Sequence, residues 1–185
     1  MSVLLVIAGP SGVGKGTIVR RLLERNPEMW LSISATTRKS RSGEEHGREY
    51  WFLSPEEFEQ QRDAGQFLES FNVFDAKYGT PRGPVEERLA AGQDVVFEID
   101  VKGAQAIKAA YPEALTIFIK PPSREVLRKR LHDRDPSADA DELDRRLAEA
   151  DAEEALATAF DHTVVNDDLD RAVEEVQAAV DAART

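Results

Sequence analysis

The chain has 185 residues, of which 41% are hydrophobic and 32% charged, and its formal net charge is −11. This length favours one domain, and the composition excludes collagen-like, low-complexity and mostly disordered chains. The absence of cysteine excludes disulfides, thiolate metal sites and a cysteine nucleophile, while the acidic balance disfavours binding to duplex nucleic acid.

The first predicted element is a buried strand over the apolar run Val3–Ala8. The run is far shorter than the roughly 20 residues that span a bilayer. It also lacks the charged start and the small-residue cleavage site of a signal peptide. We therefore expect a cytoplasmic protein that acts away from membranes.

A glycine-rich segment follows this strand and opens a helix. It reads Gly9-Pro10-Ser11-Gly12-Val13-Gly14-Lys15-Gly16-Thr17. The glycines let backbone N–H groups turn toward one centre, and the helix N-terminus and Lys15 add positive charge, so the segment predicts a phosphate-binding loop rather than an ordinary turn. The strict motif has Ser or Thr directly after the lysine, whereas here Gly16 precedes Thr17. Thr17 is therefore the candidate for a hydroxyl near Mg²⁺.

The helix after this loop has one apolar face and is predicted to stop at Asn26-Pro27. Residues 32–80 then interrupt the alternation of strands and helices. They hold short β-like pieces at 50–52 and 67–71 around one helix, whose start is signalled by Ser54, Pro55 and Glu57. We interpret residues 32–80 as an inserted α+β subdomain.

Strands and helices alternate again in the rest of the chain. The predicted strands are Asp94–Ile99, Leu115–Ile119 and Thr163–Val165, and the predicted helices are Val101–Tyr111, one after Ser123, Asp141–Thr158 and Leu169–Ala183. This order implies a mainly parallel sheet with helices on both faces. The segment Asp133–Asp141 is predicted to be an exposed, mobile loop, and the acidic run Asp139–Glu154 a solvated helix face without an ion-pair network.

A second set of residues suited to phosphate lies in the insertion. Arg38 and Arg41 are three residues apart and Tyr50 follows, so charge-assisted hydrogen bonds can hold a phosphate dianion. The full run is Ser34-Ala35-Thr36-Thr37-Arg38, Arg41, Gly43-Glu44, Gly47, Tyr50 and Phe52. It resembles the GMP-binding region of guanylate kinases at every fixed position of that pattern.

The resemblance extends from the phosphate loop to about Asp170. Further matching segments are Phe67-Leu68-Glu69, Tyr78-Gly79-Thr80, Glu98-Ile99-Asp100, Gly103-Ala104, Pro121-Pro122-Ser123 and Val165-Asn166-Asp167-Asp168. The chain departs from the family pattern at three positions within the part of the chain that resembles it. Lys77 replaces a frequent tyrosine, Glu98 replaces a more usual aspartate, and Asp135 replaces a usual glycine. The Gly-Lys-Gly-Thr ending of the loop is similar to that of adenylate kinases.

The resemblance implies a three-layer α/β P-loop kinase with a central parallel sheet, an inserted α+β GMP-binding subdomain and a helical lid. The implied core is 1–31, 81–131 and 142–185, the insertion 32–80 and the lid 132–141. The implied reaction transfers the γ-phosphoryl group of ATP to GMP, with Mg²⁺ bridging the ATP phosphates. ATP and GMP would be the ligands of a monomer or homodimer, without nucleic-acid or membrane partners.

The resemblance also implies a role for individual residues. ATP would be bound by the phosphate loop from Gly9 to Thr17 and by Asn166. GMP would be bound by Ser34, Arg38, Arg41, Glu44, Tyr50, Glu69, Tyr78, Thr80 and Asp100. The catalytic residues would be Lys15, Arg41, Arg134 and Arg146, with Arg130 and Arg145 as further candidate lid arginines.

Two alternatives remain open at this point. The first is a related P-loop kinase for another acceptor such as a phosphorylated sugar, which the run from Arg38 to Tyr50 and Glu69 disfavour. The second is a phosphopeptide-binding module like the guanylate-kinase-like domains of scaffold proteins, which tend to lose the loop lysine that is present here as Lys15. A histidine metal site is not expected, because His46, His132 and His162 show no ligand spacing.

Overall fold

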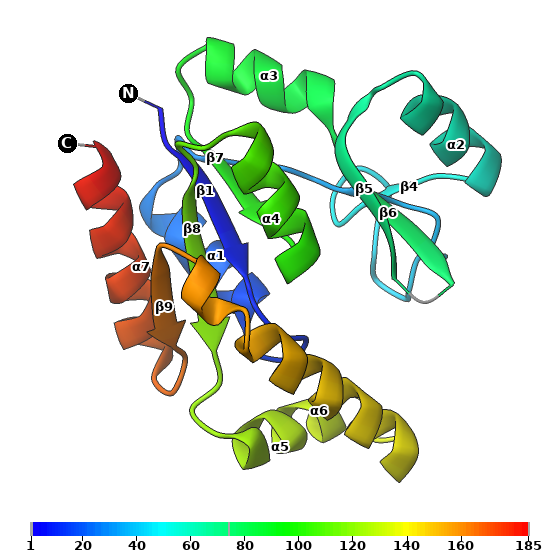
Figure 1. The fold of residues 1–185 in the computed structure, drawn as a ribbon, viewed down its shortest axis with the longest axis vertical. Helices are drawn as coiled ribbons and strands as arrows, with labels where there is room; N and C mark the ends of the chain where they lie inside the picture. Colours follow the sequence, from blue (N-terminus) through cyan, green and yellow to red (C-terminus); the bar gives the residue numbers. More distant parts are fainter. Residues whose placement is uncertain (1, 74, 185) are drawn as a thin grey trace.

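The computed structural model describes residues 2–73 and 75–184 and contains two sheets (Figure 1). The larger sheet is parallel, with strand order β2-β7-β1-β8-β9. Its strands are β1 (Leu4–Ala8), β2 (Trp30–Leu31), β7 (Val95–Glu98), β8 (Leu115–Lys120) and β9 (His162–Val165). Every residue of the central strand β1 is buried, which explains its uninterrupted apolar run.

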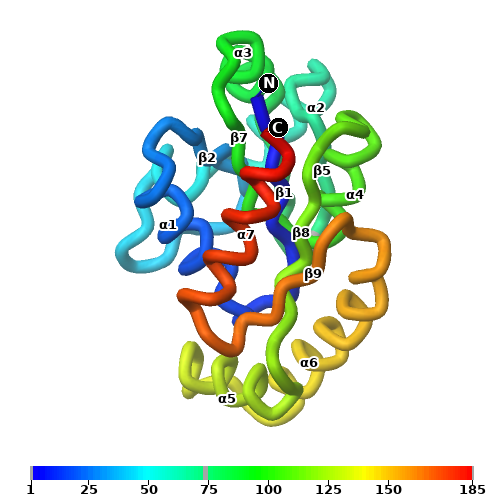
Figure 2. Tube along the Cα trace, turned by 90° about the vertical axis from the view of Figure 1, so that its left-hand side faces the viewer, coloured from blue at the N-terminus to red at the C-terminus, as the bar shows by residue number. Residues whose placement is uncertain are grey.

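Helices cover both faces of this sheet and give three layers (Figures 1 and 2). Helices α1 (Lys15–Arg25) and α7 (Leu169–Arg184) pack on one face, and α3 (Arg82–Ala90) and α4 (Val101–Ala110) pack on the other. Successive residues of β1 point to opposite faces of the sheet. Leu5 packs in the cluster with α1 and α7, whereas Val6 packs in the cluster with α3 and α4. The predicted α/β class with a central parallel sheet is confirmed.

A smaller sheet lies beside the core, in the order β4-β3-β6-β5. It comprises β3 (Ala35–Thr36), β4 (Trp51–Phe52), β5 (Phe67–Val73) and β6 (Ala76–Pro81), with α2 (Pro55–Asp63) between β4 and β5. The predicted start of α2 is confirmed, because Ser54 and Glu57 form a reciprocal capping box and Pro55 occupies the first turn. Phe58 of α2 stacks on Phe67 of β5 with ring centroids 4.6 Å apart.

Helices α5 (Arg124–Arg134) and α6 (Ala140–Glu154) form a third unit at one end of the core (Figure 1). They pack through Leu127, Leu131, Leu143, Leu147 and Ala150. The predicted loop at 133–141 is shorter than expected, because α5 continues through Arg134 and the Asp139 side chain caps α6 by accepting from the Glu142 N–H at 2.8 Å.

The prediction that the acidic run of α6 lacks an ion-pair network is wrong in part. Asp144 and Asp151 pair with Arg128 and Arg124 of α5 at 2.7 and 3.1 Å. These partners come from a neighbouring helix, where spacing within α6 does not reveal them. Among the described residues, no helix is long and apolar enough to cross a membrane.

Candidate active site

A cavity of about 1400 Å³ lies where the core sheet, the smaller sheet and the α5–α6 unit meet. It opens at the carboxyl ends of β1 and β7, the edge at which parallel sheets bind ligands. The sequence-predicted residues on its wall are Gly9, Ser11, Gly12, Gly14, Lys15, Gly16, Thr17, Ser34, Arg38, Arg41, Glu44, Tyr50, Glu69, Tyr78, Asp100, Arg130, Arg134 and Arg146. Five others, Pro10, Val13, Thr80, Arg145 and Asn166, are not part of this wall.

The phosphate loop connects β1 to α1 and folds around the Lys15 side chain. Gly9 has a φ of +140°, and a Cβ there would lie 2.3 Å from the Ile119 carbonyl oxygen, so only glycine fits. The Lys15 ammonium donates to the carbonyls of Gly9 and Pro10 at 2.5 and 3.0 Å. Burial lowers the pKa of Lys15, whereas the nearby carboxylates of Glu98, Glu153 and Asp100 raise it.

Two side chains from outside the loop hold it in shape through the Val13 carbonyl. The Asn166 amide nitrogen donates to the Val13 carbonyl at 2.8 Å, and Arg130 donates to the same carbonyl at 3.1 Å. Arg130 also donates to the Asn166 carbonyl at 3.0 Å. Asn166 is buried and therefore supports the loop from behind.

The smaller sheet supplies the opposite wall. The Arg38 guanidinium forms two parallel hydrogen bonds with the Glu44 carboxylate, at 2.9 and 3.0 Å, and lies over the Tyr50 ring. The backbone N–H of Arg41 donates to the same carboxylate at 2.7 Å. This pairing raises the pKa of Arg38 and lowers that of Glu44. Glu44 thus draws the two arginines together on one side of the cavity.

Glu69 is a buried acid on the wall formed by the smaller sheet. The Thr80 hydroxyl donates to its Oε1 at 2.5 Å, while its Oε2 is buried and has no hydrogen-bond partner among the described residues. Burial raises the pKa of Glu69 to about 7, with Asp100 adding to the rise and Thr80 opposing it. A buried acceptor without a donor is costly, so this oxygen is suited to a ligand that brings N–H groups.

Helices α5 and α6 bring cations to the cavity from a third side. Arg134 lies close enough to lower the pKa of both Lys15 and Glu98. Arg146 pairs with Glu142 on its own helix and lies 3.7 Å from Asp135. Arginines on this unit can cover a ligand held between the other two walls.

The sequence analysis missed two acids on the inward face of α6. Glu149 and Glu153 line the cavity three and seven residues after Arg146, a spacing that places all three on one helix face. The Glu153 Oε2 is buried without a partner among the described residues, and burial raises its pKa. Their spacing from Arg146 is the signal that could have found them.

The end of β7 brings two more carboxylates to the cavity beside Lys15. Asp100 caps α4 by accepting from the Gly103 N–H at 2.7 Å. Glu98 is exposed to the cavity and to a groove along α1, yet desolvation by the surrounding protein raises its pKa against the opposing effect of Lys15 and Arg134. Within residues 2–73 and 75–184, no group of three or more His, Asp or Glu is arranged to hold a metal ion alone.

Comparison with known proteins places the chain in a family. The family model described as guanylate kinase matches residues 1–183. The chain is 52% identical to a guanylate kinase of Gloeobacter violaceus over 96% of its own length and 86% of that protein. It is 49% identical to one of Symbiobacterium thermophilum, over 96% of this chain and 83% of that protein.

Solved structures agree with these sequence matches. A crystal structure of guanylate kinase from Anaplasma phagocytophilum superposes with a TM-score of 0.81 at 32% identity, covering 98% of this chain and 85% of that chain. A gluconokinase from Sinorhizobium meliloti, at 19% identity and a TM-score of 0.54 over 97% of this chain and 92% of that one, shares the fold. The predicted P-loop kinase fold is therefore confirmed.

Proposed function

The chain belongs to the guanylate kinase family and is an ATP:GMP phosphotransferase, and on this premise we propose which of its residues carry out each part of the reaction. The observation that carries the proposal is one cavity with the phosphate loop on one wall and the Arg38, Tyr50 and Glu69 group on another. Two nucleotides bound to these walls would face each other with their phosphates between them. Such an arrangement supplies the in-line approach that phosphoryl transfer needs.

The phosphate loop would bind ATP. Its backbone N–H groups and the N-terminus of α1 favour anions, and Lys15 would exchange the carbonyls of Gly9 and Pro10 for phosphate oxygens. Asn166 would keep the loop in shape through its bond to Val13. The direct contact between Asn166 and ATP that the family resemblance implies stays a prediction.

The smaller sheet would bind GMP. Arg38 and Arg41, held by Glu44, would take the phosphate together with the hydroxyls of Tyr50 and Tyr78. The residues proposed to read the base are Glu69, Asp100 and Ser34, with Thr80 orienting Glu69 from behind. The free Glu69 Oε2 accounts for selectivity, because guanine offers N1–H and an N2 amino group where adenine offers an acceptor and no amino group.

Four cations would stabilise the transferring group. Lys15 comes from the loop, Arg41 from the GMP wall, and Arg134 and Arg146 from α5 and α6. Charge that develops on the phosphoryl oxygens is stabilised most when the donors are already in place and water is excluded. Closure of the α5–α6 unit over the cavity would meet both conditions.

The residues on the wall also fit Mg²⁺ bound together with ATP. Thr17, Glu98 and Asp100 offer oxygen atoms beside Lys15, but no protein-only cage exists among the described residues. That donor set suits an ion that keeps several waters and takes its other oxygens from phosphate. When bound, Mg²⁺ would neutralise phosphate charge. Thr17, Glu98 and Asp100 would orient the water shell.

The test is ADP formation with GMP, AMP, ribose phosphates or no acceptor. We expect kcat/KM for GMP to exceed that for AMP by about a thousandfold or more, since a site with buried polar groups rejects a mismatched ligand strongly. Equal use of a ribose phosphate would favour the alternative kinase, and absence of turnover would favour the binding module. The cytoplasmic location, the monomeric or dimeric state and the lack of nucleic-acid or membrane partners stay predictions.

A further inference from the structure

Glu153 carries a buried carboxylate oxygen that the proposed reaction does not use. The residue lies near the end of α6 and lines the cavity, and its Oε2 is buried without a hydrogen-bond partner among the described residues. Burial raises the pKa of this carboxyl; Lys15 opposes the rise most strongly, Asp100 and Glu149 add to it, and Lys102 opposes it. A buried acceptor without a donor lowers stability, so its presence calls for a reason other than stability.

The contacts at the end of α6 place Glu153 beside the phosphate loop. The next residue, Glu154, pairs with Lys120 at the end of β8 at 3.1 Å. Lys120 follows Ile119, whose carbonyl oxygen lies against Gly9, the first residue of the loop. The last turn of α6 is therefore fixed at the edge of the sheet from which the loop begins, and Glu153 lines the cavity at that edge.

Lys15 has a donor that matches this acceptor. Its ammonium carries three N–H groups and donates to the carbonyls of Gly9 and Pro10, which leaves one N–H without an acceptor in the part of the chain that the structure describes. A bound phosphate would draw the ammonium off these carbonyls and into the cavity, whose wall includes Glu153. An acceptor without a donor and a donor without an acceptor thus share one space.

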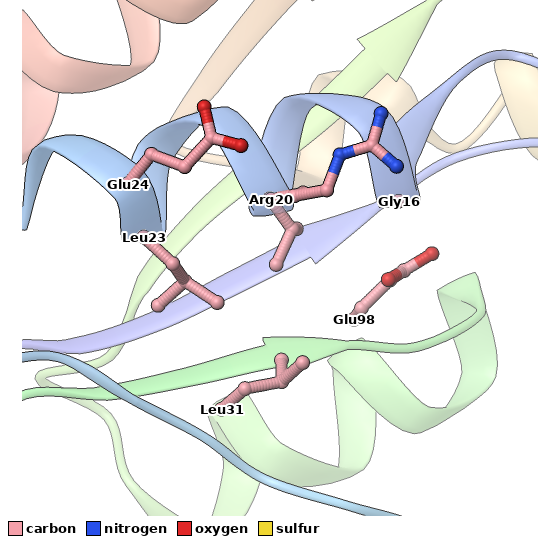
Figure 3. A pocket seen from close by; sticks show the side chains of 7 residues that line it. Gly16, Arg20, Leu23, Glu24, Leu31 and Glu98 are labelled. Carbon is pink, nitrogen blue, oxygen red and sulfur yellow. The ribbon is translucent and has the colours of Figure 1, made fainter. Parts of the chain in front are cut away.

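The two other acids near Lys15 are less suited to accept this N–H. Asp100 already accepts from a backbone N–H in the first turn of α4, at 2.7 Å. Glu98 is exposed, and Figure 3 shows it beside Arg20 of α1, where it borders a groove along that helix. Of these three acids, Glu153 is the one with an oxygen that is both closed off from solvent and unpartnered.

The position of Glu153 along α6 keeps it near the loop when the α5–α6 unit closes. Glu153 adjoins Glu154, which is anchored to Lys120, whereas Arg146 lies about 12 Å further along the helix. Rotation of α6 about its anchored end would carry Arg146 across the cavity and move Glu153 little. Glu153 is therefore available to the loop lysine in both the open and the closed state.

We propose that Glu153 is a positioning residue for Lys15: once ATP is bound, its carboxylate accepts one N–H of the Lys15 ammonium and turns the other two toward the phosphates. The proposal rests on the proposed function, because it assumes that ATP binds at the loop. The phosphates take the place of the Gly9 and Pro10 carbonyls, and Glu153 fixes the third direction of the ammonium. Developing phosphoryl charge is stabilised most by donors that are already oriented.

The test compares ADP formation by Glu153→Met and Glu153→Gln, with GMP as the acceptor. Methionine keeps the length of the side chain and removes both the acceptor and the charge. We expect kcat of Glu153→Met to fall about tenfold or more, the scale of a lost hydrogen bond to a charged group, and KM for GMP to stay within about twofold because the GMP wall is intact. Glu153→Gln should lie between, since its amide oxygen still accepts.

Stability separates this role from a structural one. Without nucleotide, Glu153→Met should melt at the same temperature as the unaltered protein or higher, because it removes a buried oxygen that has no donor. Asp94 is the matched control, a buried acid that accepts from the Val3 N–H and pairs with Arg184, both at 2.6 Å. Asp94→Asn should lower the melting temperature and leave kcat unchanged.

Dependence on the lysine is tested in the Lys15→Ala background. There, Glu153→Met should change the residual turnover by less than about twofold, because the group that Glu153 orients is gone. Three results would overturn the proposal: full kcat in Glu153→Met, a fall in melting temperature that parallels the loss of kcat, or a further loss in the Lys15→Ala background. Absence of turnover in the unaltered protein would instead count against the proposed function.

Discussion

Replacing Glu69 by glutamine should stabilise the nucleotide-free protein while it damages GMP binding. In the folded protein the pKa of Glu69 is about 7, against an ordinary value of 4.5, chiefly because the carboxyl is buried. The folded state therefore binds the proton more tightly than the unfolded state. Stability is fully retained below pH 4.5 and is lost as the pH rises through 7.

The size of this loss follows from the shift of the pKa. One unit corresponds to about 1.4 kcal/mol, so the ionised carboxylate costs about 3 kcal/mol of unfolding free energy above pH 7. Glutamine keeps an oxygen for the Thr80 hydroxyl and carries no charge, although its amide nitrogen is left without an acceptor. We expect the difference in unfolding free energy between Glu69→Gln and the unaltered protein to grow by about 3 kcal/mol between pH 4.5 and 8.

The assay is urea unfolding at several pH values, with Glu174→Gln on the exposed surface of α7 as the control. In parallel, KM for GMP in the unaltered protein should rise up to about tenfold per pH unit below 7, since guanine needs the ionised acceptor. Glu69→Gln should bind GMP weakly without this dependence. A stability difference that does not change with pH, or unchanged preference for GMP over AMP, would refute the reasoning.

Three further predictions concern the other parts of the site. Lys15→Ala should lower kcat by about a hundredfold or more while the protein still folds, because it removes charge stabilisation and leaves the loop glycines in place; near-normal turnover would contradict the loop assignment. Thr17→Val should raise KM for ATP several-fold at fixed Mg²⁺ and leave the Kd for GMP unchanged, and equal KM values would show that water replaces the hydroxyl. GMP should slow hydrogen exchange in residues 32–80, and a non-hydrolysable ATP analogue should slow it in 133–141, because each ligand brings anions to separated arginines. If neither segment responds to a saturating ligand, closure of the site does not occur.

Local signals account for the parts of the fold that the sequence predicts well. The helix at Pro55–Asp63 was predictable because Ser54 and Glu57 satisfy each other's backbone groups within one turn. The buried strand β1 was predictable because both of its faces lie against helices. Strands β2 and β3 have two residues each, too few to show a period, and α3 contains Gly83 and Pro84, which hide its helical pattern.

The residues of the candidate site divide in the same way, into those with a local sequence signal and those brought together only by packing. Lys15 and Arg38 were found because their neighbours in sequence make up the motif. The spacing of Glu153 from Arg146 indicates a shared helix face, but its proximity to Lys15 depends on how α6 packs against the core. The proximity of Glu98 to the first turn of α1 is also a tertiary property, because it depends on β7 lying beside α1.

The central claim is that ATP and GMP occupy facing walls of one cavity. The most direct measurement is calorimetry with adenosine and guanosine joined by a polyphosphate chain. The geometry predicts one molecule bound per chain, tighter than either nucleotide, competing with both, and weakened by Lys15→Ala and by Glu69→Gln. Binding of two molecules per chain, or competition with only one of the two nucleotides, would contradict the claim.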